Sequence, residues 1–178
     1  MAQMELAVLD LIQEFFRNPF MDSLMPAVTR LGDAGFFWIL LGLVLFCSRK
    51  YRRTGAAVLL SLAADLVICN LFLKNMAARV RPCDLNPAVQ LLIARPSDFS
   101  FPSGHTAAAF TAVFSLYREN NRLWKPVLVL ASVIAFSRMY LYVHFPTDVL
   151  GGVAVGWVCA LAGQALSGRL LPPEKEVY

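Results

Sequence analysis

The sequence predicts an all-α fold, a polytopic transmembrane helical bundle of about five to six membrane helices with interfacial amphipathic helices at the N-terminus. Of its 178 residues, 58% are hydrophobic and 16% are charged, whereas a soluble domain carries about 25% charged residues. The mean hydropathy is +0.58, and the apolar residues form several long runs. We therefore expect a single membrane-embedded domain over 1–178, with interfacial helices (1–33), a transmembrane core (34–167) and a polar tail (168–178).

The N-terminal stretch 4–16 has the apolar spacing of a helix, with Leu9 and Ile12 on one side and Glu5 and Glu14 on another. It is too short and too charged to span a membrane, so we expect it to lie along the membrane surface. An amphipathic helix packed on the bundle is the alternative. A break follows at residues 18–19, and a second short helix is expected after it, up to residue 31.

Five apolar segments form the predicted core. A spanning helix needs about 20 residues, and only the second, fourth and fifth segments are comfortably long. The segments cover residues 34–47, 55–73, 104–117, 126–143 and 148–166.

The connections between these segments predict the orientation. Basic residues crowd 49–53 and 118–125, which the positive-inside tendency places in the cytoplasm. The other two connections are then extracytoplasmic, although the first of them also carries basic residues, which we attribute to function. The net charge of +4 is too mild to indicate nucleic-acid binding, and the four cysteines show no paired spacing that would suggest a disulfide or zinc site.

The first polar stretch is Lys74-x6-Arg81-Pro82. If the second segment continues as a helix, Lys74 and Arg81 share a face, and Pro82 ends that helix. A lysine point charge beside a planar arginine fork suits a phosphate. Two basic residues that hold lipid headgroups are the alternative.

The second stretch, Pro102-Ser103-Gly104-His105, opens the third segment. Ser103 is a good helix cap, and the free N–H groups of a helix start bind anions. Gly104 allows a ligand close to the backbone, and His105 could donate a proton to a leaving oxygen. A capped helix start with an interfacial histidine is the alternative.

The third stretch is Ser137-Arg138-x5-His144-x3-Asp148. Arg138 closes the fourth segment, where a charge must be paired or solvated. The spacing of His144 and Asp148 allows the carboxylate to hold one imidazole nitrogen and leave the other free to attack. An ordinary His–Asp pair at a helix start is the alternative.

Taken together, K-x6-RP, PSGH and SR-x5-H-x3-D resemble the motifs of the type 2 phosphatidic acid phosphatase family of membrane lipid phosphatases, and they match without substitution over 74–148. The resemblance implies that His144 is a nucleophile forming a phosphohistidine, that Asp148 orients it, and that His105 is the general acid. It also implies catalysis without metal or cofactor. The phosphate-binding residues that it implies are Lys74, Arg81, Ser103, Gly104 and Arg138.

We therefore expect a bacterial plasma-membrane enzyme that hydrolyses a phosphomonoester or pyrophosphate bond of a lipid phosphate on the extracytoplasmic side. Undecaprenyl diphosphate is the leading substrate, and phosphatidylglycerol phosphate or phosphatidic acid is the runner-up. A lipid-phosphate binding or transport protein without chemistry is the alternative class. The expected partners are the lipid substrate and membrane lipids, and nothing in the sequence indicates an oligomeric state. Asp65, inside the second segment, is left out of the site. The apolar stretch 88–93 could cover the site or anchor the loop at the membrane surface.

Overall fold

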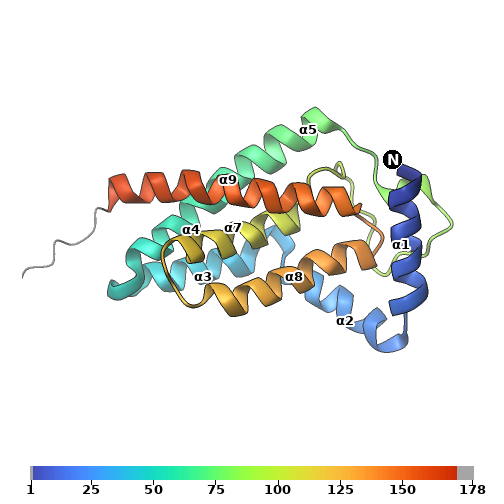
Figure 1. Cartoon of the computed structure of the whole chain (residues 1–178), viewed down its shortest axis with the longest axis horizontal. Helices are drawn as coiled ribbons and strands as arrows, with labels where there is room; N and C mark the ends of the chain where they lie inside the picture. The colour runs from blue at the N-terminus through green and yellow to red at the C-terminus, as the bar shows by residue number, and fades with distance from the viewer. Residues whose placement is uncertain (1, 172–178) are drawn as a thin grey trace, which may run out of the picture.

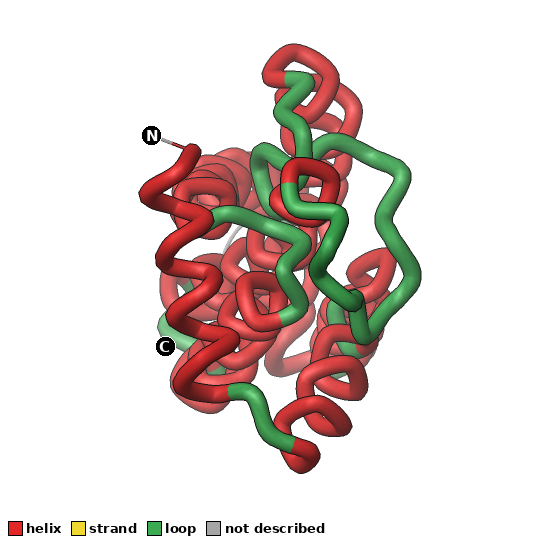
Figure 2. Tube along the Cα trace, turned by 90° about the vertical axis from the view of Figure 1, so that its right-hand side faces the viewer, coloured by secondary structure: helices red, strands yellow, loops and turns green. Residues whose placement is uncertain are grey.

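The computed structural model describes residues 2–171, and all of their regular structure is helical (Figure 2). This confirms the predicted all-α fold. The polar tail predicted over 168–178 lies largely outside the described residues. The elements are α1 (Ala2–Phe16), α2 (Pro19–Arg30), η1 (Asp33–Gly35), α3 (Phe36–Cys47), η2 (Arg49–Tyr51), α4 (Arg52–Asp65), η3 (Leu66–Leu73), α5 (Lys74–Ala77), α6 (Pro82–Leu85), α7 (Gly104–Arg118), α8 (Trp124–Tyr140) and α9 (Pro146–Leu170).

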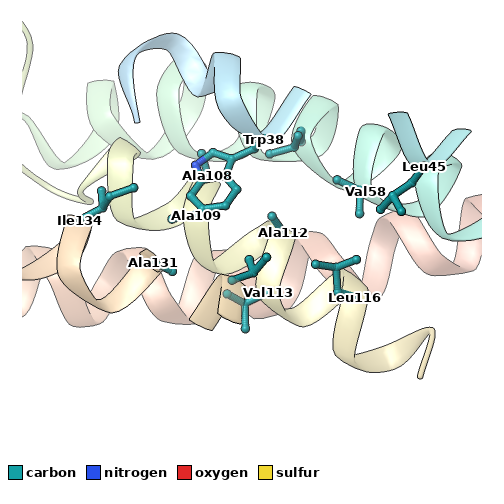
Figure 3. Close-up of a cluster of buried hydrophobic side chains, with 12 residues drawn as sticks. Trp38, Leu45, Val58, Ala108, Ala109, Ala112, Val113, Leu116, Ala131 and Ile134 are labelled. Carbon is teal, nitrogen blue, oxygen red and sulfur yellow. The ribbon is translucent and has the colours of Figure 1, made fainter. Parts of the chain in front are cut away.

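Five helices form the bundle, in which α7 packs against α4, α8 and α9, and α4 packs against α3 and α9 (Figure 1). Small side chains permit this close packing: Ala108, Ala109 and Ala112 of α7 are buried in one cluster with Trp38 and Val58 (Figure 3). Gly163 of α9 touches α4 so closely that a Cβ there would lie 2.0 Å from Ser61 Oγ. The core therefore depends on small residues at the helix crossings.

The helix α1 lies across one end of the bundle, beside the α8–α9 connection (Figures 1 and 2). It buries Leu9, while Phe15 stays exposed. Among the polar contacts that dock it, Gln13 Nε2 donates to Tyr140 O at 2.6 Å, and the Tyr142 hydroxyl donates to Asp10 at 2.7 Å. One face of the predicted amphipathic helix is thus packed on the bundle, and its place at a membrane surface stays a prediction.

Two helical stretches in the described part of the chain are long and apolar enough to cross a bilayer, namely Arg49–Leu85, which includes a break after Ala77, and Pro146–Leu170. A third results if α2 and η1–α3, which meet at a bend of 44°, count as one broken span. The helices α7 and α8 have 15 and 17 residues, fewer than the roughly 20 that a perpendicular span requires. The protein is an integral membrane protein, and its five to six spans remain a prediction.

The second apolar segment does not continue as a helix to Arg81, so that prediction was wrong. The helix α5 ends at Ala77, and Ala78 adopts a left-handed conformation with φ of +43°. The helical backbone conformation is disfavoured for a residue that precedes a proline. Arg81 is accordingly extended, with ψ of 155°. Pro82 therefore begins α6 instead of ending the preceding helix.

Candidate active site

The three polar stretches come together at the end of the bundle that carries α1. A cavity of about 660 Å³ lies between the start of α7, the α8–α9 connection and the loop before α7. Two of the predicted site residues, Ser103 and Asp148, are fully buried beside it, and Ser103 N donates to Asp148 O at 3.0 Å. The predicted residues that line the cavity are Lys74, Arg81, Gly104, His105, Arg138 and His144.

The imidazole of His144 is 1% exposed and follows the turn that ends α8. Its Nε2 lies 3.2 Å from an Arg81 N–H, and its Nδ1 lies 3.6 Å from Asp148 Oδ2. The distance between His144 Nδ1 and Asp148 Oδ2 is within the range of an ion pair but slightly long for a hydrogen bond. This arrangement favours the proton on Nδ1 and a lone pair on Nε2. Burial above all, with the charges of Arg81 and Arg138, lowers the pKa of His144 to about 3 against the opposing effect of Asp148, so the ring is neutral at pH 7.

The carboxylate of Asp148 is fixed by partners from three segments. Its Oδ2 accepts a hydrogen bond from Ser100 Oγ at 2.5 Å and another from Phe145 N at 2.8 Å. Its Oδ1 accepts one from Arg79 at 2.5 Å. Because Phe145 is the N-cap of α9, the bond from its N–H also stabilises the helix start.

The guanidinium of Arg81 is held on all sides. It donates to Val143 O at 2.7 Å, to Asp98 O at 2.8 Å and to Asp98 Oδ1 at 2.6 Å. Lys74 forms an ion pair with the other oxygen of the same carboxylate. Burial alone raises the pKa of Asp98, but Lys74 and Arg81 outweigh it and lower the pKa to about 2. Asp98 is therefore ionised, and its carboxylate binds Lys74 and Arg81 in the way that an anionic ligand would.

The start of α7 lies next to Lys74 and lines the same cavity as Arg81. A Cβ on Gly104 would lie 2.9 Å from Asn70 Oδ1 and 3.7 Å from Lys74 Nζ, which explains why glycine fits there. The hydroxyl of Ser103 does not cap the helix, contrary to prediction, and accepts a hydrogen bond from the Thr106 hydroxyl at 3.0 Å instead. The backbone N–H groups of this first turn are left for a ligand.

Two partners of the site come from the N-terminal third, where no motif pointed to them. Asp33 Oδ1 lies 3.0 Å from His105 Nε2 and so stabilises the protonated imidazole. Arg138 is 4% exposed and donates to Thr29 Oγ1 at 2.5 Å. The only sequence signal for Asp33 was its place in a Gly-Asp break before an apolar run.

A second cavity of about 540 Å³ adjoins the first and shares Lys74, Asp98, Gly104 and His105 with it. Its other walls are mostly apolar, and Asp65 lines this cavity, not the cavity that holds the cations. The apolar residues 91–93 of the loop before α7 line the first cavity and pack on the cluster around Met25.

The sequence model of the PAP2 superfamily matches residues 54–169. Phosphatidylglycerophosphatase B of Bacillus subtilis is 37% identical over 153 residues, which cover 79% of this chain and 72% of that protein. An undecaprenyl-diphosphatase of Sulfolobus acidocaldarius is 27% identical over 146 residues, covering 81% and 70%. The crystal structure of Aquifex aeolicus LpxE superimposes with a TM-score of 0.76 at 31% identity, covering 90% of this chain and 94% of that one. The chain therefore belongs to the PAP2 superfamily, and it is a membrane lipid phosphatase.

Proposed function

We propose that this phosphatase acts through a phosphohistidine on His144, at the extracytoplasmic face, and that undecaprenyl diphosphate is its substrate. The observation that carries the proposal is the placement of His144 Nε2. It faces a cavity with fixed cations, while Nδ1 faces the carboxylate of Asp148. A neutral imidazole held in this way is an activated nucleophile.

In the first step, Nε2 of His144 attacks the terminal phosphorus. A P–N bond forms, the bond from phosphorus to the lipid-side oxygen breaks, and that oxygen takes a proton from His105. Asp148 stabilises the positive imidazole ring that results. In the second step, a water molecule attacks the phosphorus, the P–N bond breaks, and the water proton passes to His105, so that inorganic phosphate leaves and both histidines return to their starting states.

The cations Lys74, Arg81 and Arg138 and the N–H groups at Gly104 neutralise the charge on the phosphoryl oxygens, and the Ser103 hydroxyl is the fifth group that we assign to phosphate binding. All three cations are at least 90% buried, so their charges act in a site of low dielectric. A substrate phosphate takes the place that the Asp98 carboxylate occupies on Lys74 and Arg81. Asp98 can leave because its side chain is 52% exposed.

The charge of the cavity supports a headgroup with two phosphates. Arg30 and Arg95 also line it, which makes five cationic side chains against the carboxylates of Asp33 and Asp98. Undecaprenyl diphosphate and phosphatidylglycerol phosphate both carry two phosphates, whereas phosphatidic acid carries one. The second candidate is phosphatidylglycerol phosphate, because the B. subtilis relative bears the name phosphatidylglycerophosphatase.

Placement of the site on the extracytoplasmic side rests on the basic residues. The site loops and the basic connections at 49–53 and 118–125 lie at opposite ends of the bundle (Figure 1). Positively charged connections favour the cytoplasm. This supports a site that receives its lipid on the outer face of a bacterial plasma membrane.

The test is release of phosphate by detergent-purified protein in EDTA, from undecaprenyl diphosphate, phosphatidylglycerol phosphate and phosphatidic acid, with His144→Ala beside the wild type. We expect release that survives EDTA, disappears in the variant and is fastest from undecaprenyl diphosphate. Faster release from phosphatidylglycerol phosphate would favour the second candidate. Full turnover by His144→Ala, or loss of release in EDTA, would contradict the mechanism.

A further inference from the structure

Arg79 lies between two carboxylates that come from opposite ends of the sequence. One terminal nitrogen is 2.5 Å from Asp148 Oδ1 and 2.7 Å from Thr147 Oγ1, and the other is 2.5 Å from Glu5 Oε2. The guanidinium also sits over the ring of Phe145, 4.1 Å from its centroid. Glu5 belongs to α1, Asp148 to α9, and Arg79 to the link between α5 and α6.

We propose that Arg79 and Glu5 are positioning residues of the phosphatase, through which the N-terminal helix α1 takes part in orienting the nucleophile. Arg79 fixes the carboxylate of Asp148 beside His144, and Glu5 offsets the charge of Arg79. This inference rests on the proposed function, in which Asp148 orients His144.

Arg79 is needed because the other partners of Asp148 bind only one of its oxygens. Ser100 and the N–H of Phe145 both donate to Oδ2, the oxygen that faces His144. Among the described residues, only Arg79 donates to Oδ1, and the Asp148 side chain has no exposed surface. Without Arg79, this buried oxygen loses its partner and the carboxylate can rotate away from the imidazole.

Glu5 is needed because an arginine so close to Asp148 would by itself cancel much of the negative potential at His144. The carboxylate of Glu5 lies on the far side of Arg79 and also accepts hydrogen bonds from the Thr147 N–H and hydroxyl. Burial raises the pKa of Glu5, but these bonds and Arg79 together lower it, so Glu5 is ionised at neutral pH. The row of Glu5, Arg79 and Asp148 therefore keeps one net negative charge for the imidazole that becomes positive when phosphorylated.

The contribution of α1 lies outside the family match, which begins at residue 54. Arg79 lies inside the matched region, but its partner Glu5 does not. The contact is therefore not described by the superfamily pattern, and it depends on how α1 docks in this chain.

A purely structural role would give the same geometry, so docking must be separated from positioning. Asp10 provides the comparison, because it ties α1 to the Tyr142 hydroxyl and does not touch Arg79. Glu14 provides the neutral control, because it is an exposed carboxylate on the same helix. If the contacts of Glu5 only dock α1, Glu5→Gln and Asp10→Asn should lower kcat to a similar extent. If Glu5 helps to position Asp148, only Glu5→Gln should lower kcat.

The experiment measures kcat, KM and the midpoint of thermal unfolding for full-length Arg79→Gln, Arg79→Lys, Glu5→Gln, Asp10→Asn and Glu14→Gln, with the lipid on which the wild type is most active. We expect kcat to fall about 100-fold in Arg79→Gln and about 10-fold in Glu5→Gln, with KM changed less than about threefold. Arg79→Lys should recover part of the loss, and Glu14→Gln should match the wild type. Asp10→Asn should lower the midpoint of thermal unfolding, because it weakens the bond from the Tyr142 hydroxyl, but keep kcat within about threefold.

Equal losses of kcat in Asp10→Asn and Glu5→Gln would overturn the inference, and so would wild-type kcat in Arg79→Gln. His144→Ala, measured in parallel, distinguishes a failure of the positioning role from a failure of the proposed phosphohistidine mechanism. If that variant is inactive while Arg79→Gln is fully active, only the positioning role fails. If His144→Ala turns over, the proposed mechanism itself fails.

Discussion

Replacing Asp98 by asparagine should strengthen binding of inorganic phosphate, the reaction product. The Asp98 carboxylate pairs with both Lys74 and Arg81, which a phosphate must also reach. The change keeps the size of the side chain and leaves the bond from Arg81 to the backbone oxygen of Asp98. It removes only the competing charge.

The size of the effect follows from the pKa of Asp98, which is lowered from 3.8 to about 2. This net shift, in which the cations outweigh burial, corresponds to roughly 2.5 kcal/mol. Because the side chain is half exposed, solvent screening reduces the figure to about 1 kcal/mol. Removing this competition should lower the inhibition constant of phosphate about fivefold.

The assay is competitive inhibition of lipid hydrolysis by inorganic phosphate, measured at pH 6 and pH 8. Because the pKa of Asp98 is about 2, its carboxylate is ionised at both pH values, and the ratio between variant and wild type should be the same. Asp22→Asn is the control, since Asp22 pairs with Arg17 at 3.5 Å and neither residue lines the cavity. An unchanged or larger inhibition constant in Asp98→Asn would refute the reasoning.

Three further predictions concern the nucleophile and the glycines. With a pKa of about 3, the His144 ring should stay neutral as the pH falls to 5. NMR of labelled histidine can detect this in a His105→Gln variant, in which His144 is the only histidine. A charged His144 ring at pH 6 would contradict the prediction. Gly104→Ala should raise KM at least about tenfold, since its Cβ would crowd the groups that bind phosphate, and an unchanged KM would argue against that site. Gly163→Ala should destabilise the fold by about 1–3 kcal/mol in thermal unfolding in detergent. Gly168→Ala should not, because a Cβ there would meet only Arg53 Nη2, at the ordinary contact distance of 3.9 Å.

The sequence was most informative where a chemical requirement and a helix boundary coincide. The start of α7 at Gly104 was predicted at the right residue, and apolar runs located α3, the stretch of α4 and η3, α8 and α9 to within a few residues. The three motifs indicated a shared site because all of them lie in or beside the two connections predicted on the same side of the membrane. The path of Arg81 was misjudged, although the proline after it already disfavours a helix at that position.

The supporting partners could not be predicted, because they depend on tertiary packing. Asp98 and Arg79 were visible only as charges in a loop, and their partners are far away along the chain. Glu5 is separated from Arg79 by 74 positions and from Thr147 by 142, so no spacing rule connects them. Such contacts depend on where α1 docks, and amphipathic periodicity predicts that a helix docks without indicating its partner.

The most direct test of the mechanism is to capture the covalent intermediate. Protein mixed with a lipid diphosphate labelled in its terminal phosphate would be stopped with alkali within one turnover and analysed by peptide mass spectrometry. We expect the label on His144, stable in base and labile in acid, and no label in His144→Ala. Label on another residue, or single-turnover hydrolysis with no labelled histidine, would contradict the central claim.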